Sequence, residues 1–520
     1  MKVEHEQEEA SQFIATLLLL TLGGPCNIMT THSYIACDLG AESGRVILGT
    51  LAEGRLTLEE IHRFPNGPVQ TEHGMRWDIH RLFDEIKTGL KLVAARSEKP
   101  ESISVDSWGV DYVLVDGKTD ALALPYHYRD PRTDLVYAEV QKTELPETIF
   151  AETGIQFMPI NSLYQLLAHQ QAEPETLADA DHVLLIADYF GAKLSGVGRA
   201  ERSLASTTQL YNPATREWSK TLTSEFKLPA HLLPPLADSG TILGPLLPQI
   251  AAETGLQNVQ IVATCSHDTG AAVAAVPEEG DDWAFLSSGT WSLLGVELSH
   301  PLINAEVQQA NFTNEIGFGG TVRFLKNIAG LWIVQECRRT WLAKGKSYTY
   351  DELIQMAEAS PPLRSLLNPA DPRFLAPGGM PGKVREFCRS TGQPVPETPG
   401  EIVRCALESL ALSYKDTLTQ IEALTGRTLT RLHIVGGGSR NALLNQFAAD
   451  ATGRKVLAGP VEATAIGNVL LQAVTLGHLD GAAALRRTVQ ASFPIQSFAP
   501  GDFQAWQEAD ARFQLLETHL

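Results

Sequence analysis

The sequence predicts an α/β protein built from two similar domains with a cleft between them. Its 520 residues exceed what one compact core usually holds. Two segments, 34–49 and 283–295, each contain an apolar strand, a turn of Gly, Ser or Thr, and a second apolar strand. Such turns direct backbone N–H groups and small hydroxyls into one space, which suits phosphate oxygens. One turn in each half therefore predicts a duplicated fold that holds a nucleotide from both sides for phosphoryl transfer.

The composition is typical of a globular enzyme with small-molecule partners. Hydrophobic residues make up 44% of the chain and charged residues 20%. The balance of 41 basic against 61 acidic residues gives a formal charge of −20, and Lys and Arg form no run. We therefore expect no nucleic-acid partner. We also expect no membrane partner, and either a monomer or a homodimer.

The first 32 residues are expected to be an extension outside the fold. The apolar run at 13–22 is too short to span a bilayer. It follows an acidic segment, where a signal peptide needs positive charge. A secreted form is the alternative, but we favour a disordered or mis-assigned extension with a start at Met29.

Cysteine usage favours a reducing cytoplasm. The six cysteines form no Cys-x-x-Cys pair and no zinc-binding pattern. Cys388 and Cys405 are near enough in the sequence to bridge a loop, although two free thiols are the preferred interpretation.

The first domain, expected over 33–275, begins with a three-strand meander at 35–39, 46–51 and 56–64. A helix follows over 79–93, where apolar residues recur along one stripe. A buried strand at 103–105 then runs into the segment 106–111. Meander, helix and returning strand form the pattern of a ribonuclease H-like sheet covered by helices.

The middle of the chain differs from both repeats. Residues 125–255 are mixed and rich in Pro, which indicates insertions that build a substrate pocket. A buried strand at 259–263 and a small-residue helix at 269–275 close the first domain.

The second domain, expected over 276–520, starts again with strand, turn and strand. A long amphipathic helix is predicted over 402–424, followed by a strand at 432–435 and a glycine turn at 436–438. A helix at 441–452, a strand at 455–458 and a last core helix complete the pattern. This order repeats the first domain.

Asp38 ends a buried strand just before the first turn. Carboxyl ends of strands face the ligand crevice of an open α/β sheet. There Asp38 can hold Mg²⁺ through water, because Mg²⁺ keeps several waters and takes few carboxylates. Alone, this Asp would be explained as a turn residue. The matching turn at 287–290 favours a phosphate site, and the chain has no Walker A loop.

Asp268 is the candidate catalytic base. It lies between a buried strand and a small-residue helix, where its carboxylate can accept a proton from a substrate hydroxyl. Ser266, His267 and Asp268 are not a hydrolase triad, because consecutive residues point apart. Helix capping alone would also explain an Asp here, and the two roles are compatible. Trp108, Trp291 and Trp332 are candidates to line a sugar site, although most aromatic residues belong to cores.

Four motifs together resemble the FGGY family of carbohydrate kinases, part of the superfamily of sugar kinases, actin and heat-shock ATPases. They are Asp38-Leu-Gly-Ala-Glu-Ser-Gly-Arg45, Ser266-His-Asp-Thr269, Ser287-Ser-Gly-Thr-Trp-Ser292 and His433-Ile-Val-Gly-Gly-Gly438. Stretches at 61–64, 106–114, 325–332 and 458–463 are most similar to the family members that phosphorylate L-rhamnulose at O1. The resemblance extends from about Tyr34 to the C-terminal region.

The resemblance implies an actin-like ATPase fold, ATP and Mg²⁺ as cofactors, and a cytoplasmic kinase of L-rhamnose catabolism. It makes Asp268 the general base. The implied ATP contacts are Ala41, Glu42, Ser43, Gly44, Arg45, Thr290, Gln335 and Gly437. The implied sugar contacts are Gly109, His267, Asp268, Thr269 and Asn327.

Glu42 departs from the family pattern, since it puts a negative charge in the first phosphate turn. Its side chain must point away from ATP, or Arg45 and Mg²⁺ must compensate for it.

Two alternatives stay open. The chain could phosphorylate another ketose, such as L-fuculose or xylulose, or it could be a catalytically silent sugar sensor. The intact Asp38, Asp268 and phosphate turns argue against the sensor.

Overall fold

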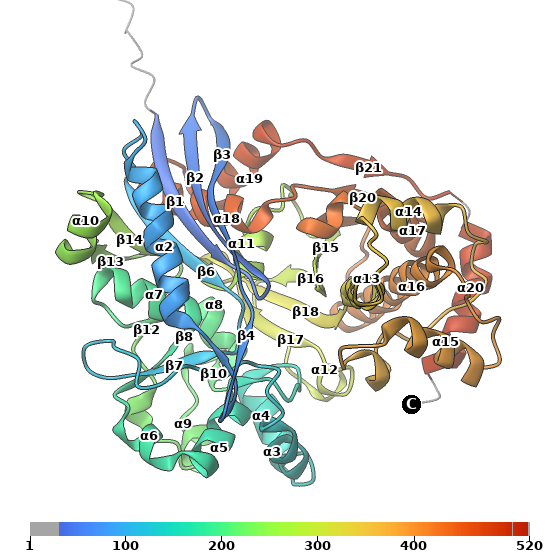
Figure 1. The fold of residues 1–520 in the computed structure, drawn as a ribbon, viewed down its shortest axis with the longest axis horizontal. Coiled ribbons are helices and arrows are strands. Elements are labelled where there is room, and N and C mark those ends of the chain that lie inside the picture. Colours follow the sequence, from blue (N-terminus) through green and yellow to red (C-terminus); the bar gives the residue numbers. More distant parts are fainter. Residues whose placement is uncertain (1–30, 502, 518–520) are drawn as a thin grey trace, which may run out of the picture.

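The computed structural model describes residues 31–501 and 503–517. The predicted N-terminal extension, with Met29, lies outside the described residues except for Thr31 and His32. Figure 1 shows two bodies side by side, each built on a central sheet. No helix in the described ranges is long and apolar enough to cross a membrane.

The first sheet has six strands in the order β13-β14-β6-β1-β2-β3. β1 to β3 form an antiparallel meander, whereas β6 and β14 run parallel to β1. The predicted meander and returning strand are confirmed. The bounds are β1 (His32–Leu39), β2 (Ser43–Ala52), β3 (Arg55–Pro65), β6 (Ser102–Ser107), β13 (Thr241–Pro245) and β14 (Gln260–Ala263).

The second sheet repeats this order within seven strands, β17-β18-β16-β15-β19-β20-β21. β15, β16 and β18 form the antiparallel meander, and β19 and β20 run parallel to β15. The predicted duplication is therefore confirmed. The bounds are β15 (Trp283–Ser288), β16 (Trp291–Leu298), β17 (Thr313–Ile316), β18 (Val322–Ala329), β19 (Arg431–Val435), β20 (Lys455–Ala458) and β21 (Gln496–Phe498).

Two helices, α11 (Asp268–Ala274) and α18 (Ala463–Thr475), are packed between the two sheets. One apolar cluster joins Tyr34 and Ala36 of β1, both helices, and Phe285 of β15. The alternate residues of β1 point to the opposite face. The helices approach at Gly467, where a Cβ atom would lie 1.9 Å from the carbonyl oxygen of Ala271. The contact is therefore one of backbone against backbone.

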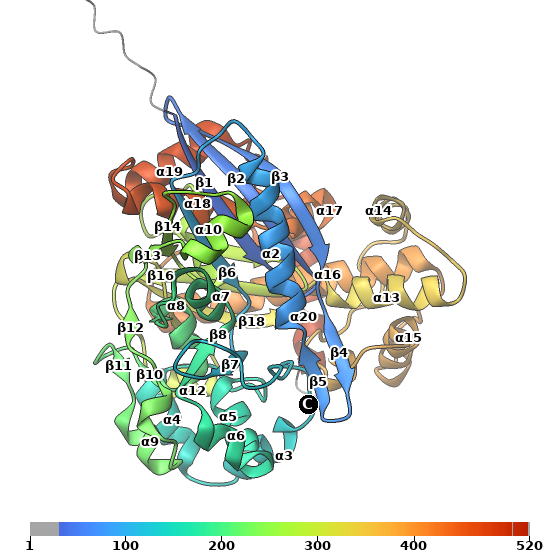
Figure 2. The same ribbon diagram turned by 60° about the vertical axis from the view of Figure 1, so that its left-hand side comes forward.

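Other helices cover the outer faces of the sheets. On the first sheet these are α2 (Ile79–Ala94), α7 (Ile186–Ser195) and α10 (Pro248–Thr254). On the second, α16 (Pro399–Thr425) and α17 (Ala442–Thr452) lie against the sheet. Outside them is a further layer of α13 (Trp332–Ala343), α14 (Tyr350–Glu358), α15 (Met380–Ser390) and α20 (Phe503–Glu517); Figure 2 shows α13, α14 and α15 at its right-hand side.

The long helix α16 has clear end signals. Thr398 and Glu401 form a capping box at its start, and Gly426 ends it with a φ of 70°. Its predicted existence is confirmed. The prediction that α18 is the last helix is wrong, because α19 (Gly481–Ser492) and α20 follow it.

The insertion forms a small body with its own core, below the first sheet in Figure 1. It contains the antiparallel pair of β7 (Tyr112–Val115) and β8 (His182–Leu185), which are distant in the sequence. Its helices are α3 (Thr133–Val140), α4 (Leu145–Thr153), α5 (Ser162–Ala172), α6 (Pro174–Asp179), α8 (Arg202–Ala205) and α9 (Lys220–Glu225). Short elements complete the chain: β4 (Pro68–Thr71), β5 (Gly74–Trp77), β9 (Ala200–Glu201), β10 (Tyr211–Asn212), β11 (Glu217–Trp218), β12 (Leu236–Ala237) and α12 (Ala305–Gln309).

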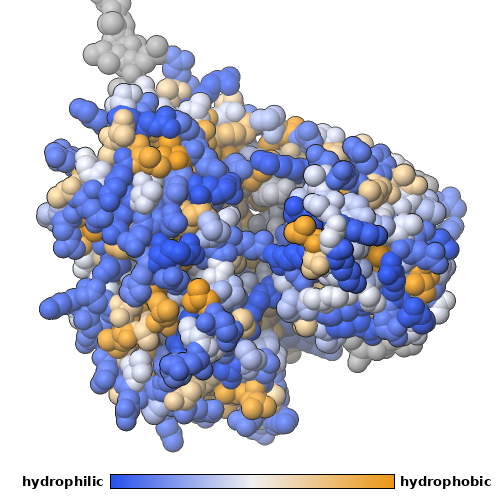
Figure 3. All heavy atoms as spheres, viewed as in Figure 1, coloured by the Kyte–Doolittle hydropathy of each residue, from blue (hydrophilic) through white to orange (hydrophobic). Residues whose placement is uncertain are grey.

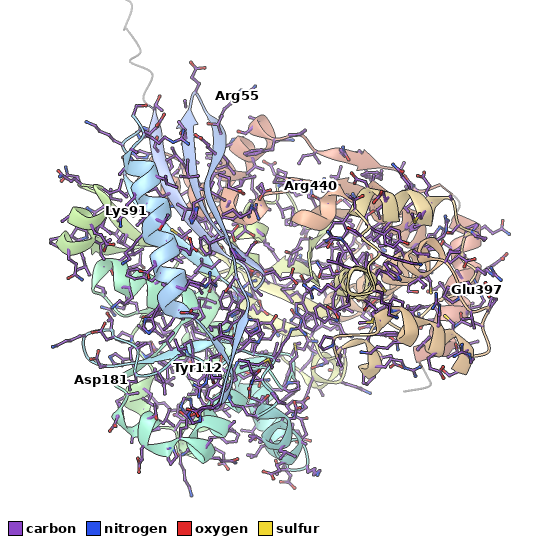
Figure 4. All side chains as sticks on the ribbon, viewed as in Figure 1. Arg55, Lys91, Tyr112, Asp181, Glu397 and Arg440 are labelled. Carbon is purple, nitrogen blue, oxygen red and sulfur yellow. The ribbon has the colours of Figure 1, made fainter. Side chains whose placement is uncertain are left out.

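One hydrogen bond connects the first sheet with a helix near the C-terminus. Arg55, labelled in Figure 4 at the start of β3, donates from Nη1 to the carbonyl oxygen of Ala491 in α19 at 2.7 Å.

Cys388 and Cys405 are both buried and form no disulfide, as preferred from the sequence.

Candidate functional site

A cavity of about 470 Å³ lies between the two bodies and is lined by residues of both. Figure 3 shows the molecule hollowed between them. The first turn, the loop after β6, the insertion and the start of α11 contribute from the first half. The second turn, β17, β18 and the glycine turn contribute from the second.

Most of the predicted site residues meet in this cavity. Those that line it are Ala41, Glu42, Ser43, Gly109, His267, Asp268, Thr269, Thr290, Asn327 and Gly437. Asp38, Gly44, Arg45 and Gln335 lie outside its lining. Trp108 and Trp291 also line it, whereas the ring of Trp332 packs against the guanidinium groups of Arg129 and Arg339.

Each phosphate turn is closed by a hydrogen bond from the backbone of its glycine. Gly40 N donates to Ser43 O, three residues further on, and Gly289 N donates to Trp291 O, two residues further on, both at 2.9 Å. The glycine turn packs directly against the second turn, because a Cβ atom at Gly438 would lie 2.0 Å from Ser288 Oγ. Three small turns thus meet at the cavity, where backbone N–H groups can approach an anionic ligand.

Arg45 does not face the cavity. Its guanidinium pairs with Asp38 on one side and with Glu462, just before α18, on the other. This contact therefore joins β1, β2 and the second half of the chain. The residue orders the carboxylate of Asp38 rather than standing free beside the turns.

Asp106 is a buried carboxyl group that lies beside Asp38. The two residues are partners in the parallel pairing of β1 and β6. Asp106 Oδ2 accepts from Asn468 Nδ2 at 2.6 Å, whereas its buried Oδ1 has no hydrogen-bond partner among the described residues. Burial raises the pKa of Asp106 well above its ordinary value, and the charges of Asp38 and Asp268 raise it further. This donor set fits a hard divalent cation.

Arg339 compensates the charge of Glu42. The Glu42 carboxylate accepts from Arg339 Nη2 at 2.5 Å, so the first turn is bridged to α13. The sequence offered two explanations for Glu42: a side chain that points away from ATP, or compensation of its charge by Arg45 and Mg²⁺. The part of the second explanation that involves Arg45 is wrong, because Arg45 is engaged by Asp38 and Glu462.

Asp268 is the first residue of α11, and His267 occupies the N-cap position. Capping therefore does not explain this aspartate. Its Oδ1 accepts from the backbone N of Thr269 at 2.5 Å and from Thr269 Oγ1 at 3.1 Å. Burial raises the pKa of Asp268, as does the nearby Asp38, while His267 opposes the shift. A carboxylate with a raised pKa in a cavity is suited to accept a proton.

Gln156 is a cavity residue that sequence reasoning missed. Its Oε1 accepts from the backbone N of Asn327 at 2.9 Å and from Asn327 Nδ2 at 3.0 Å. The insertion thereby orients a predicted sugar contact of β18, across 171 positions of sequence. Only the Pro-rich composition around it hinted that this segment reaches the pocket.

Asp111 organises the aromatic wall of the cavity. Its Oδ2 accepts from Trp77 Nε1 at 2.6 Å, from Trp108 Nε1 at 3.0 Å and from the backbone N of Tyr128 at 3.2 Å. Its Oδ1 accepts from Gln165 Nε2 at 2.8 Å. Burial raises the pKa of Asp111 to about 6, and these donors oppose that shift.

Replacing Asp111 by asparagine is expected to destabilise the protein by about 1–3 kcal/mol, because the new amide donor would face existing donors in a buried site. Urea denaturation measures this change. The same replacement at partly exposed Asp116, which accepts two backbone N–H groups, serves as the control and should have little effect. Equal stability of the two variants would contradict the role given to Asp111.

Comparison with known proteins extends these observations. Two models of the FGGY family of carbohydrate kinases match the chain: the N-terminal domain over 33–275 and the C-terminal domain over 284–476. A rhamnulokinase of Bacteroides thetaiotaomicron is 44% identical, with 93% of this chain and 99% of that protein covered. A rhamnulokinase of Enterococcus faecalis is 43% identical, with coverages of 90% and 94%.

Solved structures share the fold at low identity. A gluconate kinase of Lactobacillus acidophilus superposes with a TM-score of 0.79 at 15% identity, covering 94% of this chain and 98% of its own. A xylulose kinase of Rhodospirillum rubrum gives a TM-score of 0.76 at 19% identity, covering 94% and 99%. These similarities support the actin-like ATPase architecture.

Proposed function

Because this chain belongs to the FGGY family of carbohydrate kinases, we propose that it transfers the γ-phosphoryl group of ATP to O1 of L-rhamnulose. The products are L-rhamnulose 1-phosphate and ADP, in the cytoplasmic breakdown of L-rhamnose. The substrate rests on the similarity to rhamnulokinases over most of the chain. The chemistry rests on one observation: the carboxylate of Asp268, about one-third exposed, lines the same cavity as both phosphate turns.

Asp268 acts as the general base in this proposal. It takes the proton from the O1 hydroxyl while O1 attacks the γ-phosphorus in line, and the bond from that phosphorus to the leaving oxygen of ADP breaks. Gly109, His267, Thr269 and Asn327 hold the sugar, and closure of the cavity excludes water.

The phosphate turns hold the nucleotide. We assign its contacts to Ala41, Glu42, Ser43, Gly44, Thr290, Gln335 and Gly437. Arg45, which the sequence also predicts as a contact, acts on the nucleotide site indirectly, through Asp38 and Glu462. Residues 33–275 then form the sugar-binding domain with the base, and 276–520 form the nucleotide-binding domain.

The family implies a divalent metal, and we propose Mg²⁺ held through water by Asp38. The unpartnered Oδ1 of Asp106 beside it supports this placement. A bound cation would offset the negative charge of the phosphates.

The test is coupled ADP release with Mg²⁺-ATP against L-rhamnulose, L-fuculose, D-xylulose, L-ribulose and glycerol. We expect kcat/KM for L-rhamnulose to exceed that for the other ketoses by at least about tenfold. Preference for another ketose would discard the substrate and keep the kinase. Absence of sugar-dependent ADP release would discard the kinase and favour a sugar sensor.

A further inference from the structure

A buried arginine lies directly behind the sugar-binding side of the cavity. Arg323 of β18 has no exposed surface. Its Nη2 lies 3.1 Å from His267 Nδ1, and its Nη1 lies 3.1 Å from Glu315 Oε2. Nε and Nη2 also donate to the carbonyl oxygen of Ile316, at 3.3 and 3.1 Å. These contacts hold the guanidinium in one orientation.

The chemistry of arginine determines where the proton of His267 sits. A guanidinium stays protonated and offers donors but no acceptor. Nδ1 of His267 must therefore accept, with its lone pair directed at Arg323. The single proton of the neutral imidazole is then on Nε2.

Glu315 is the other charged group at this nitrogen. Its Oε2 lies 3.3 Å from His267 Nδ1, so by itself it would favour a proton there. Its charge is matched by Arg323, however. Burial works to raise the pKa of Glu315, but the charge of Arg323 opposes it and the pKa lies below its ordinary value, so the carboxylate stays ionised. The ion pair neutralises the charge behind the imidazole and orients the guanidinium.

The other nitrogen of the ring faces the reaction site. His267 Nε2 lies 3.5 Å from Asp268 Oδ1, and a Cβ atom at Gly109 would lie 3.4 Å from it. A donor and a proton acceptor are thus side by side at the cavity. This spacing matches two oxygens carried by neighbouring carbons of one substrate.

We propose that Arg323, together with Glu315, is a positioning residue that fixes His267 in its Nε2–H form. His267 then donates a hydrogen bond to the substrate oxygen on the carbon next to the phosphorylated one. The position of the proton rests on the contacts of the unliganded protein, while the identity of the substrate oxygen rests on the proposed function. For a ketose phosphorylated at O1, that oxygen is O2.

The first experiment is ¹⁵N NMR of histidine-labelled, unliganded protein, with His267 assigned by its loss in the variant His267→Gln. We expect the unprotonated nitrogen to be Nδ1 and the protonated one Nε2. A proton on Nδ1, donated to Glu315, would overturn the proposal. This readout needs no turnover, so it stands apart from any failure of the proposed function.

The second experiment removes both members of the Arg323–Glu315 ion pair, so that neither charge is left buried without its partner. The double variant Arg323→Met/Glu315→Gln is expected to raise the KM of the ketose about 3- to 10-fold, with the KM of ATP unchanged and kcat little affected. It should also give a mixture of His267 tautomers in the NMR experiment.

The chain offers a matched control outside the cavity lining. Arg431, Glu278 and His433 form another Arg–Glu–His cluster, in which Glu278 and His433 are buried and Arg431 is partly exposed, with Arg431 Nη1 2.8 Å from Glu278 Oε2. The variant Arg431→Met/Glu278→Gln should lose stability without changing the KM of the ketose. An equal rise of KM in both double variants would reduce Arg323 to a structural role.

The variant His267→Gln distinguishes an effect of Arg323 through His267 from a purely structural effect. The amide NH₂ of the glutamine lies near the position of the histidine Nε2, and it can donate whether or not Arg323 is present. In the His267→Gln background, the Arg323→Met/Glu315→Gln change should therefore alter the KM of the ketose less than about twofold. An unchanged 3- to 10-fold effect there would contradict action through His267.

Discussion

Replacement of Asp268 by asparagine is expected to lower kcat by a factor of about 10² to 10⁴, with the KM of the ketose nearly unchanged. Asparagine has the same shape and keeps an oxygen that can accept from the backbone N of Thr269, as Asp268 Oδ1 does. The helix start and the cavity wall therefore stay in place. What is lost is the group that accepts the proton of the attacking hydroxyl.

The measurement is steady-state ADP release over a range of ketose and ATP concentrations. Asp78 provides a matched control, because it also stands at a helix start and accepts from the backbone N of Arg81 at 3.0 Å. Asparagine is an equally good N-cap, so Asp78→Asn should preserve both stability and turnover. Near-normal turnover of Asp268→Asn would remove this residue from the role of base.

Replacement of Gly467 by alanine is expected to destabilise the protein by about 3 kcal/mol or more, the upper end of overpacking effects. The new methyl group would overlap the carbonyl oxygen of Ala271, which a Cβ atom would approach to 1.9 Å. This obstacle is backbone in the first turns of α11 and cannot rotate away. We also expect turnover to fall, since any shift of α11 displaces Asp268.

Denaturant unfolding measures the effect, and Gly382 in α15 is its control. A Cβ atom at Gly382 meets open space, so alanine there should be neutral or stabilise by up to about 1 kcal/mol through helix propensity. Similar stabilities of the two alanine variants would contradict the close approach of α11 and α18.

The sheets and the phosphate turns could be predicted because their signals are local. The continuous apolar run of β1, which is buried on both faces, and the glycine in each turn are visible within a few residues of sequence. Asp268 could be found because it lies between a buried strand and a small-residue helix. His267 and Thr269 line the same cavity because they are its neighbours in the sequence.

The supporting residues could not be found in this way. Arg323 stands between apolar neighbours in β18, where a charged residue usually indicates a solvated strand face, yet it is fully buried. Gln156 and Asp111 act through partners that the fold brings close from distant segments. Their roles depend on hydrogen bonds between segments that are distant in the sequence, and the hydrophobic periodicity of a single segment carries no information about such contacts.

The crossing of α11 and α18 has a mechanical consequence for how ligands enter. Because the two backbones are already in contact at Gly467 and Ala271, the helices cannot move closer together. The two halves of the molecule can then move mainly by tilting about this crossing, which acts as a fulcrum. Thr269 and Thr464, near this fulcrum, would be displaced least. The Glu42–Arg339 bridge, with side chains about half exposed, joins the first turn to α13 of the second half and has to part if the halves tilt. An exposed pair of this kind contributes only about 0–1 kcal/mol, so the entrance can open at small cost while the catalytic floor stays fixed.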